Sequence, residues 1–397
     1  MFKHVNKYIG DPILSFIEIY KKDKRQNLIN LSVGLYYNEH SLIPQLKAVE
    51  RAKTIIFNEK KIESYPYLPM EGLKSYLVAV KKLLFGVDFI NKYKCIANIQ
   101  TIGGSGALKI GADFLKSYFP NSQVWVSNPT WDNHISIFVG SGFKVNYYPY
   151  FDKKLLKVNF EDMLDCFNKL DKYSIVLLHP CCHNPTGSDL NNKQWDKLIL
   201  VMAERKIIPF LDIAYQGFSQ GLDKDAYAVR KIAKKMPCLV SQSFSKIFSL
   251  YSERIGSLSV CCNNENDCER VLGQLKATVR RNYSSPPRFV AQVVEKVLNT
   301  PYLMKMWIEE IENMRLRINL MRYKLHNELK LILPNTNFDY LLNQKGMFSL
   351  TGLNKKQVHD MRNLYGIYLL NNGRMCLSGL NKSNFKKVAK SIAKVII

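Results

Sequence analysis

Lys246 ends the segment LVSQSFSK, in which an apolar run gives way to alternating serines. A lysine that is partly desolvated at the end of a strand can have a lowered pKa, so that its amine becomes a usable nucleophile. Ser243 can hydrogen-bond a phosphate group or the backbone, and Arg254, eight residues after the lysine, can pair with phosphate through its fork of donors. Taken alone, the segment also fits a solvated lysine in a loop.

Asp212 ends an apolar run in the segment IIPFLDIAYQGF, so we expect its carboxylate at the edge of a sheet. A nearby carboxylate keeps a pyridine nitrogen protonated, which lets the ring act as an electron sink. Tyr215, three residues on, can donate a hydrogen bond to an oxygen on such a ring. The alternative is an aspartate that caps a short helix.

A glycine-rich turn that includes Gly104 and Ser105 stands in the segment QTIGGSGALKIGADFL, at the start of a predicted helix. Backbone N–H groups at a helix start bind phosphate through unpaired donors and the helix dipole. The segment has neither the Lys-Ser/Thr ending of a P-loop nor a GxGxxG pattern, so we expect it to bind a single phosphate. A tight turn without a ligand is the alternative.

Asn184, in HPCCHNPTG, and the pair Trp131 and His134, in VSNPTWDNH, follow two further apolar runs. The Asn184 side chain supplies an amide donor beside a rigid Asn-Pro turn. Trp131 offers a flat side chain that can stack on an aromatic ring. Core packing also explains Trp131 and His134 when each is taken alone.

Short apolar runs bounded by turn residues are predicted to be strands, at residues 124–127, 144–148, 175–179, 207–212, 239–242 and 257–261. Helical patterns lie between them, including residues 107–118, 192–205 and 226–235. Runs such as SIVLLH are apolar on both faces, as strands of a parallel sheet are. The alternation predicts an α/β fold with a mostly parallel sheet flanked by helices. Ligands of such sheets bind at the carboxyl ends of the strands.

The pattern changes after about residue 300. Residues 302–329 have uninterrupted helical spacing, and the segments NFDYLL, GMFSL, GIYLL and GRMCLS are predicted to be short strands before a terminal helix. We therefore expect an N-terminal arm and part of the small domain at residues 1–44, a large cofactor-binding domain at 45–310, and a smaller α+β domain at 311–397.

The chain has 397 residues and a formal net charge of +24, which favours an anionic partner such as nucleic acid. However, Lys outnumbers Arg about three to one and the lysines are spread from end to end, whereas readout of nucleic acid favours Arg. A basic nucleic-acid-binding scaffold therefore stays the minor alternative, and we expect no nucleic acid partner.

The nine cysteines and the lack of long apolar runs bear on location. A disulfide scaffold is not expected in a chain of this size without export, and the N-terminus does not resemble a signal peptide. Cys181, Cys182 and His183 are consecutive and lack the second ligand pair of a structural zinc site, so no metal is expected. No apolar run approaches the roughly 18 residues of a membrane helix. The sequence thus predicts a cytoplasmic protein without a membrane partner.

Five predicted strand ends carry, in chain order, a phosphate turn, a stacking tryptophan, an amide donor, an acid with a phenol, and a lysine with an arginine. Each feature has an ordinary structural explanation, but chance is a poor explanation for the whole set. These are the groups that a phosphorylated pyridine aldehyde requires.

The chain also resembles the aspartate and aromatic aminotransferases, which are fold type I pyridoxal-phosphate enzymes, over essentially its whole length. The resemblance rests on the motifs HNPTG, LDIAYQGF, SQSFSKIFSLY and RRNYSSPP, on GDPIL near the N-terminus and on GRMCLSGLN near the C-terminus. VRRNYSSPP, YLPMEGL and NFDYLLNQKGMFS are most similar to the bacterial tyrosine (aromatic-amino-acid) branch. Ser285 stands where aspartate-specialised members more often have Asn, a departure that the aromatic branch shares.

The resemblance implies catalytic roles for several of these residues. Lys246 matches the lysine that holds the cofactor in a Schiff base and carries the proton. Asp212 matches the acid at the pyridine nitrogen, with His134 behind it. Tyr215 and Asn184 match the two donors to the ring oxygen.

The resemblance also implies which residues bind the cofactor ring, its phosphate and the substrate. Trp131 matches the residue that stacks on the ring, and Arg374 matches the arginine that binds the substrate α-carboxylate, with Gly34 beside it. Arg280 matches an arginine of the partner subunit that binds a side-chain carboxylate, and Leu35 is expected to bound an apolar slot. The phosphate site is matched by Gly104, Ser105, Ser243 and Arg254. Tyr67 matches a residue that completes this site from the partner subunit.

The expected activity is transamination of tyrosine and phenylalanine, and of aspartate, with 2-oxoglutarate in a ping-pong reaction. The cofactor implied is pyridoxal 5'-phosphate, and the protein implied is a homodimer with shared active sites that takes amino-acid and 2-oxo-acid substrates. An aspartate-specialised aminotransferase is the alternative; Arg374 and Arg280 speak against a β-lyase or decarboxylase. The resemblance further implies cis peptide bonds at Asn128-Pro129 and Asn184-Pro185.

Overall fold

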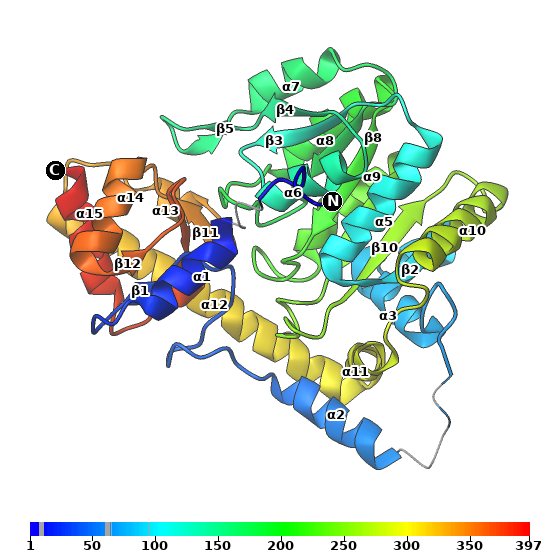
Figure 1. Ribbon diagram of the computed structural model, residues 1–397, viewed down its shortest axis with the longest axis horizontal. Helices are drawn as coiled ribbons and strands as arrows, with labels where there is room; N and C mark the ends of the chain where they lie inside the picture. Colours follow the sequence, from blue (N-terminus) through cyan, green and yellow to red (C-terminus); the bar gives the residue numbers. More distant parts are fainter. Residues whose placement is uncertain (8–11, 60–63, 65, 94) are drawn as a thin grey trace.

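The computed structural model describes residues 1–7, 12–59, 64, 66–93 and 95–397. A seven-stranded sheet lies at its centre, with helices packed around it (Figure 1). In spatial order its strands are β2 (Ile96–Ile102), β10 (Ile255–Cys261), β9 (Cys238–Ser243), β8 (Ile208–Ile213), β7 (Ile175–Leu178), β3 (Val124–Asn128) and β4 (Val145–Pro149).

Both faces of this sheet are buried, which explains the continuous apolar runs. In β7, Val176 and Leu178 belong to one core cluster, whereas Ile175 and Leu177 belong to the other. Side chains alternate between the faces of a strand, so each face packs against its own helical layer. The predicted α/β fold is therefore confirmed.

One strand departs from the parallel arrangement. β10 pairs antiparallel with both β2 and β9, while the other neighbouring strands of the sheet pair in parallel. The connection between β9 and β10, residues 244–254, contains no helix that would carry the chain back across the sheet. The reversal places the end of β9 and the start of β10 at the same edge.

Helices surround the sheet and include those predicted at residues 107–118, 192–205 and 226–235. They are α2 (Lys47–Glu59), α3 (Lys74–Phe85), α4 (Val87–Lys92), α5 (Gly103–Tyr118), α6 (Asp132–Gly140), α7 (Phe160–Asn168), α8 (Asn192–Glu204), α9 (Tyr227–Lys235), α10 (Glu265–Asn282) and α11 (Arg288–Asn299). A two-stranded ribbon, β5 (Phe151–Asp152) and β6 (Lys157–Val158), and a 3-10 turn, η1 (Lys224–Ala226), complete this part.

The long helix α12 (Pro301–Ile332) runs from the sheet layer to the C-terminal elements (Figure 1). Its buried residues recur every three or four positions from Leu303 to Leu329, the spacing of one helix face. The predicted helix at residues 302–329 is thus confirmed. The elements that follow are α13 (Tyr340–Asn343), β11 (Phe348–Leu350), α14 (Lys355–Tyr365), β12 (Ile367–Tyr368), β13 (Arg374–Cys376), η2 (Leu377–Gly379) and α15 (Phe385–Ile396).

Three of the four strand predictions in this region contain a strand, but NFDYLL does not. The Asn337 side chain accepts a hydrogen bond from the Asp339 backbone N–H (2.8 Å), which turns the chain directly into α13. The strand prediction for this segment was therefore wrong.

The N-terminal segment lies against the C-terminal elements, far from it in sequence (Figure 1). β1 (Ile29–Asn30) pairs in parallel with β12, and Tyr20 of α1 (Pro12–Lys22) packs edge-on against Tyr368, with ring centroids 5.2 Å apart. Gly10 and Asp11 of the GDPIL motif lie outside the described residues.

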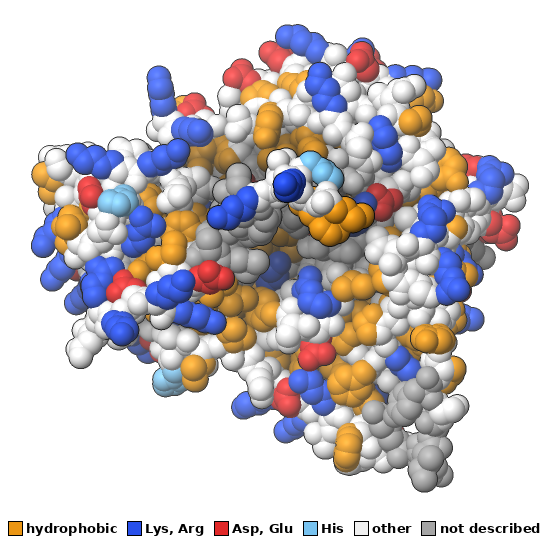
Figure 2. Space-filling view, viewed as in Figure 1, with side chains coloured by type: hydrophobic (Ala, Val, Ile, Leu, Met, Phe, Trp, Pro, Cys, Tyr) orange, Lys and Arg blue, Asp and Glu red, His pale blue; other side chains and the backbone are white. Residues whose placement is uncertain are grey.

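Two further expectations concern the backbone and the surface. The peptide bonds Asn128-Pro129 and Asn184-Pro185 are both cis, as expected. Figure 2 shows Lys and Arg side chains scattered over the visible face rather than gathered in one stripe. Among the described residues, no helix combines the length and apolar character needed to cross a membrane.

Candidate active site

The predicted site residues converge at one edge of the central sheet. Asp212 stands near the carboxyl end of β8, and Lys246 follows the carboxyl end of β9. Arg254 immediately precedes β10, whose reversed direction brings its amino end to the same edge. Gly104 lies in the first turn of α5, directly after the carboxyl end of β2. The edge rule for parallel sheets thus explains the cluster.

Helix α12 packs against the turn that carries Lys246 and fixes its position. Ile247 and Phe248 are fully buried beside the lysine. Trp307 of α12 stacks on Phe248, with ring centroids 4.7 Å apart, and its Nε1 donates a hydrogen bond to the Ile247 carbonyl (2.8 Å). A rigid aromatic support therefore sets the position of the lysine backbone.

The Lys246 side chain is buried among charged groups. Burial lowers the pKa of Lys246 to about 8; Asp212 opposes this shift, and Arg254 and Arg374 add to it. Its Nζ lies 4.9 Å from the centre of the Tyr215 ring. With a pKa of about 8, roughly one amine in ten is neutral and nucleophilic at pH 7.

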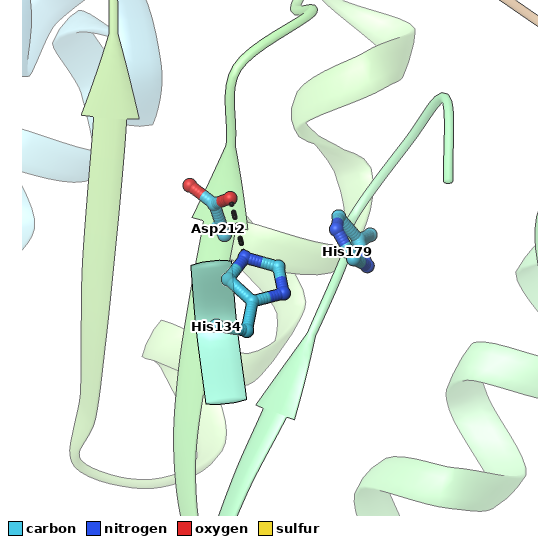
Figure 3. Close-up of side chains that lie close together, drawn as sticks. All are labelled: His134, His179 and Asp212. Atoms are coloured by element: carbon cyan, nitrogen blue, oxygen red, sulfur yellow. Dashed lines mark hydrogen bonds and ion pairs between the residues drawn. The ribbon is translucent and has the colours of Figure 1, made fainter. Parts of the chain in front are cut away.

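Asp212 is held as a carboxylate by hydrogen bonds (Figure 3). Its Oδ2 is 3.1 Å from Nε2 of His134, whose Nδ1 is 2.9 Å from Oγ1 of Thr130, and its Oδ1 accepts from Ser241 Oγ (3.1 Å). Burial acts to raise the pKa of Asp212, but the His134 hydrogen bond and nearby positive charge outweigh it, so the pKa is lowered. An ionised acid is what a protonated pyridine nitrogen needs as its partner.

His179 is the third side chain of this group (Figure 3). One ring nitrogen of His179 and one possible ligand atom each of His134 and Asp212 all lie within 4.8 Å of one another. Both nitrogens of His134 are engaged, by Thr130 and Asp212, so neither is free to bind a metal. Burial lowers the pKa of His179 to about 3, and His134 adds to this shift, so the ring is neutral. The arrangement therefore suits an organic ring nitrogen as the partner of Asp212.

The start of α5 faces Arg254 and Ser243. No side chain caps this helix, so its first N–H groups are available to a ligand. A Cβ at Gly103, where φ is +66°, would lie 2.5 Å from Nη2 of Arg254, and one at Gly104 would lie 3.0 Å from Cβ of Ser243. Glycine thus lets Arg254 and Ser243 approach the start of α5 closely, so their donors lie beside its first N–H groups.

Arg254 is oriented towards this anion site by two hydrogen bonds. Its Nη1 donates to Ser245 Oγ (3.1 Å) and to the Tyr251 carbonyl (3.0 Å). Arg254 and Ser105 line one cavity of about 510 Å³. Unpaired backbone donors, hydroxyls and an arginine are the donor set of a phosphate site.

Arg374, on β13, forms the other end of the cluster. The buried guanidinium donates from Nη1 to Asn184 Oδ1 (3.0 Å) and from Nη2 to the Ser32 carbonyl (2.7 Å), and it lies 4.3 Å from the centre of the Phe348 ring. Among the described residues, its buried Nε has no hydrogen-bond partner. Burial lowers the pKa of Arg374, and the nearby Cys376 and Tyr215 oppose this shift. A buried, partly unsatisfied arginine is suited to a carboxylate ligand.

Gly34 lies beside the Phe348 ring that Arg374 contacts, and Leu35 follows it in the chain. A Cβ at Gly34 would lie 3.0 Å from Cζ of Phe348, so glycine lets the chain approach the ring that supports Arg374. The Leu35 carbonyl accepts from Ser378 Oγ (2.7 Å). The segment is thereby anchored next to the carboxylate end.

Trp131 and Tyr215 complete the buried cluster. Trp131 immediately precedes α6, and its ring packs edge-on against His134, with centroids 5.1 Å apart. Tyr215 packs edge-on against Phe348, with centroids 5.6 Å apart. Burial strongly raises the pKa of Tyr215, so its hydroxyl keeps its proton and can donate it in a hydrogen bond.

Tyr67 and Arg280 are not brought into this buried cluster. The Tyr67 side chain is 94% exposed. Arg280 is exposed near the end of α10, where its Nη1 donates to Ser284 Oγ. Within one chain these two residues therefore lie at the surface.

Residues that contact the predicted ones but were not predicted include Thr130, Ser241, Ser32 and Phe348. Two of these four had a local signal. Ser241 stands two positions before Ser243 in a strand, hence on the same face, and Thr130 stands four positions before His134, one helical turn away. Ser32 and Phe348 come from distant segments, so no local pattern indicates them.

A larger cavity, of about 620 Å³, opens at the opposite edge of the sheet, beside the first residue of β9 and the last of β10. Its lining is mainly apolar and contains none of the predicted site residues. Because it lacks a buried titratable group paired with a charge, we do not assign chemistry to it.

Comparison with known proteins identifies the family of the chain. The family model for aminotransferase class I and II matches residues 26–392. The chain is 56% identical, over 100% of both chains, to the aromatic-amino-acid aminotransferase of Escherichia coli (strain K12). The aromatic amino acid aminotransferase of Psychrobacter sp. B6, cocrystallised with aspartic acid, is 47% identical with a TM-score of 0.97, covering 100% of both chains.

A third similar structure bears on the cofactor. The aromatic-amino-acid aminotransferase of Burkholderia pseudomallei, covalently bound to pyridoxal phosphate, is 43% identical with a TM-score of 0.97, covering 100% of both chains. Agreement in sequence and fold over the full length leaves one assignment: the chain belongs to the aminotransferase class I and II family.

Proposed function

We propose that this protein is a pyridoxal-phosphate-dependent aminotransferase that takes tyrosine, phenylalanine and aspartate as amino donors and 2-oxoglutarate as acceptor. The observation that carries the proposal is Lys246, a buried amine whose pKa is lowered to about 8 beside an ionised Asp212. Similar proteins that carry aromatic aminotransferase names, one of them cocrystallised with aspartic acid, support the choice of substrates.

The donor set around Lys246 fits the cofactor. When bound, pyridoxal phosphate supplies an electron-accepting ring that stabilises negative charge at the substrate α-carbon. Lys246 would hold the cofactor covalently; once released, its amine would take the proton from the substrate α-carbon and deliver it to a carbon of the cofactor, with the opposite transfer in the second half-reaction. Asp212, held by His134, keeps the ring nitrogen protonated.

The remaining cofactor contacts follow from the two ends of the site. Tyr215 would donate a hydrogen bond from its hydroxyl to the ring oxygen, and Asn184, whose Oδ1 is occupied by Arg374, would offer its amide N–H groups. Trp131 would stack on the ring. The phosphate would be bound by Gly104, Ser105, Ser243 and Arg254, with Tyr67 of the partner subunit.

Substrate carboxylates are bound by two arginines. Arg374 binds the α-carboxylate, because its buried Nε and its two other nitrogens present a fixed fork of donors. Arg280 of the partner subunit binds a side-chain carboxylate, while an aromatic side chain uses an apolar slot bounded by Leu35. The exposed positions of Tyr67 and Arg280 in one chain support a shared site.

This arrangement requires a homodimer. We further propose the domain limits 1–44, 45–310 and 311–397, with α12 passing through the last boundary. The nine free cysteines support a reducing, cytoplasmic location.

A substrate panel tests the function. Purified holoenzyme is mixed with 2-oxoglutarate and, separately, tyrosine, phenylalanine or aspartate, and the keto acids formed are measured. We expect turnover of all three donors and exchange half-reactions typical of ping-pong kinetics. Turnover of aspartate alone would replace the proposal with an aspartate-specialised aminotransferase.

A further inference from the structure

A second basic cavity, of about 450 Å³, lies away from the site described above. Three segments form its walls: the chain that leads from β8 into the start of η1, the middle of α12, and the end of α13 with the residues that follow it. They contribute Lys224, Arg315 and Arg322, and Lys345, respectively. The cavity therefore joins parts of the chain that are remote in sequence.

The lining of this cavity carries positive charge without a carboxylate. Four of its nine lining residues are Lys or Arg, and none is Asp or Glu. Arg315 is paired with Glu312, through Nε at 2.8 Å. Among the described residues, neither Lys224 nor Lys345 forms an ion pair, although the charge of Lys345 acts to lower the pKa of the buried Asp189.

Arg322 forms the buried floor of the cavity. It is 3% exposed, and its Nη groups donate to the backbone carbonyls of Leu341 (3.0 Å), Gly346 (2.8 Å) and Phe348 (3.1 Å). Its Nε is buried without a hydrogen-bond partner among the described residues. The guanidinium is thus hydrogen-bonded to backbone dipoles, and the buried Asp189 adds a favourable Coulomb interaction.

Two buried carboxylates lie near the cavity, and each accepts hydrogen bonds from backbone N–H groups. Asp225 accepts from three N–H groups in residues 217–220, at 2.8 to 3.0 Å. Asp189 accepts from Cys182 and His183 (both 2.8 Å), and burial raises its pKa to about 6. They moderate the positive charge from inside but leave the cavity itself cationic.

Neutral hydrogen-bond donors complete the lining. Asn319 of α12 and Gln220 face the same space, and no hydrogen bond is recorded for either side-chain amide within the described residues. Free amides beside unpaired ammonium groups form a donor set for an oxyanion. The Lys and Arg side chains of the cavity repel one another, so a bound multivalent anion would offset this electrostatic repulsion.

We propose that this cavity binds a compact oxyanion of two or more negative charges, with phosphate or carboxylate oxygens. Lys224 and Lys345 supply the charge that attracts it, and the amides of Gln220 and Asn319 orient it. Because the occupant touches three separate segments, it links the sheet layer, α12 and the chain before β11. The site is independent of the cofactor phosphate, which is bound around Arg254.

Calorimetric titration of the holoenzyme tests this site, because the cofactor then occupies its own phosphate subsite. Pyrophosphate and citrate are titrated separately at constant ionic strength, with chloride as the monovalent reference. We expect saturable binding of at least one of the two, near one per chain, and a higher thermal midpoint. Binding of pyrophosphate alone would assign phosphate chemistry; binding of both would assign oxyanions in general.

Matched variants locate the binding. The double variant Lys224→Gln/Lys345→Gln should raise the Kd of the anion at least about tenfold, since it removes both lysine charges from the cavity. Lys193→Gln/Lys197→Gln, which makes the same charge change on the exposed face of α8, should bind as the wild type does. Equal binding by the two double variants, or no saturable binding of either anion by the wild type, would overturn the proposal.

Discussion

Replacing Lys246 by methionine should stabilise the apoprotein by an amount that depends on pH. The buried lysine has a pKa of about 8, against an ordinary value of 10.5. Below pH 8 the amine is charged in both the folded and the unfolded state, so folding must bury a cation. Above pH 10.5 it is neutral in both states and the cost disappears. Between these limits the unfolded state binds more protons, so stability rises with pH.

The shift sets the size of the effect. A difference of 2.5 pKa units, 10.5 minus 8, corresponds to about 3 kcal/mol at pH 7, falling to about 1 kcal/mol at pH 9.5. The stability advantage of Lys246→Met over the wild type should therefore shrink by about 2 kcal/mol between these pH values. Any constant difference from packing of the two side chains cancels in this comparison.

Urea unfolding of the apoproteins at a series of pH values measures this change. Lys193→Met serves as the control, because Lys193 is an exposed lysine of α8 and its replacement should give a difference that does not vary with pH. A difference for Lys246→Met that is equally flat would refute the lowered pKa and, with it, the poised amine.

The remaining predictions concern the proposed roles. Borohydride reduction of the holoenzyme should fix the cofactor to Lys246, and Lys246→Ala should abolish turnover; label on another lysine would show that the assignment is wrong. His134→Phe removes a charge-assisted hydrogen bond from Asp212, so kcat/KM should fall about tenfold to a hundredfold and the acidic limb of the pH profile should move to higher pH; an unmoved limb would argue against this role. Mixing inactive Lys246→Ala and Arg280→Ala subunits should restore some turnover of aspartate, and no recovery despite subunit exchange would count against a shared site. Arg280→Ala should reduce kcat/KM for aspartate by orders of magnitude and far less for phenylalanine, whereas equal losses would make Arg280 structural.

The central strands could be predicted because their residues are apolar on both faces, but β2 was missed. Its sequence, IANIQTI, contains Asn98 and Gln100, although both side chains are buried. Asn98 donates to Ser259 Oγ (2.7 Å), and Gln100 donates to the Pro287 carbonyl (2.6 Å). Only tertiary contacts reveal the partners of these two amide N–H groups inside the fold, so hydrophobic patterning could not indicate the strand.

The catalytic residues of the site could be predicted from the sequence, but the residues that hold them in place could not. Asp212 and Lys246 each follow an apolar strand, and strand ends of a parallel sheet meet at one edge, so local patterns sufficed for them. The position of Arg374 depends on Ser32 and Phe348, which are far from it in sequence. Antiparallel β10, which brings Arg254 to the edge, likewise became evident only in the fold.

Anions bound at Arg254 and Arg374 should change the pKa of Lys246. Arg254 and Arg374 both lower the pKa of Lys246, while Asp212 raises it. An anion bound at either arginine neutralises part of that positive charge and so raises the pKa of the amine. A phosphate at Arg254 and a substrate carboxylate at Arg374 would thus make Lys246 a stronger base just when a proton has to be taken from the substrate. Under the proposed mechanism, proton transfer would then be coupled to occupancy of the site, and Arg254 and Arg374 would set the basicity of the amine as well as bind phosphate and carboxylate.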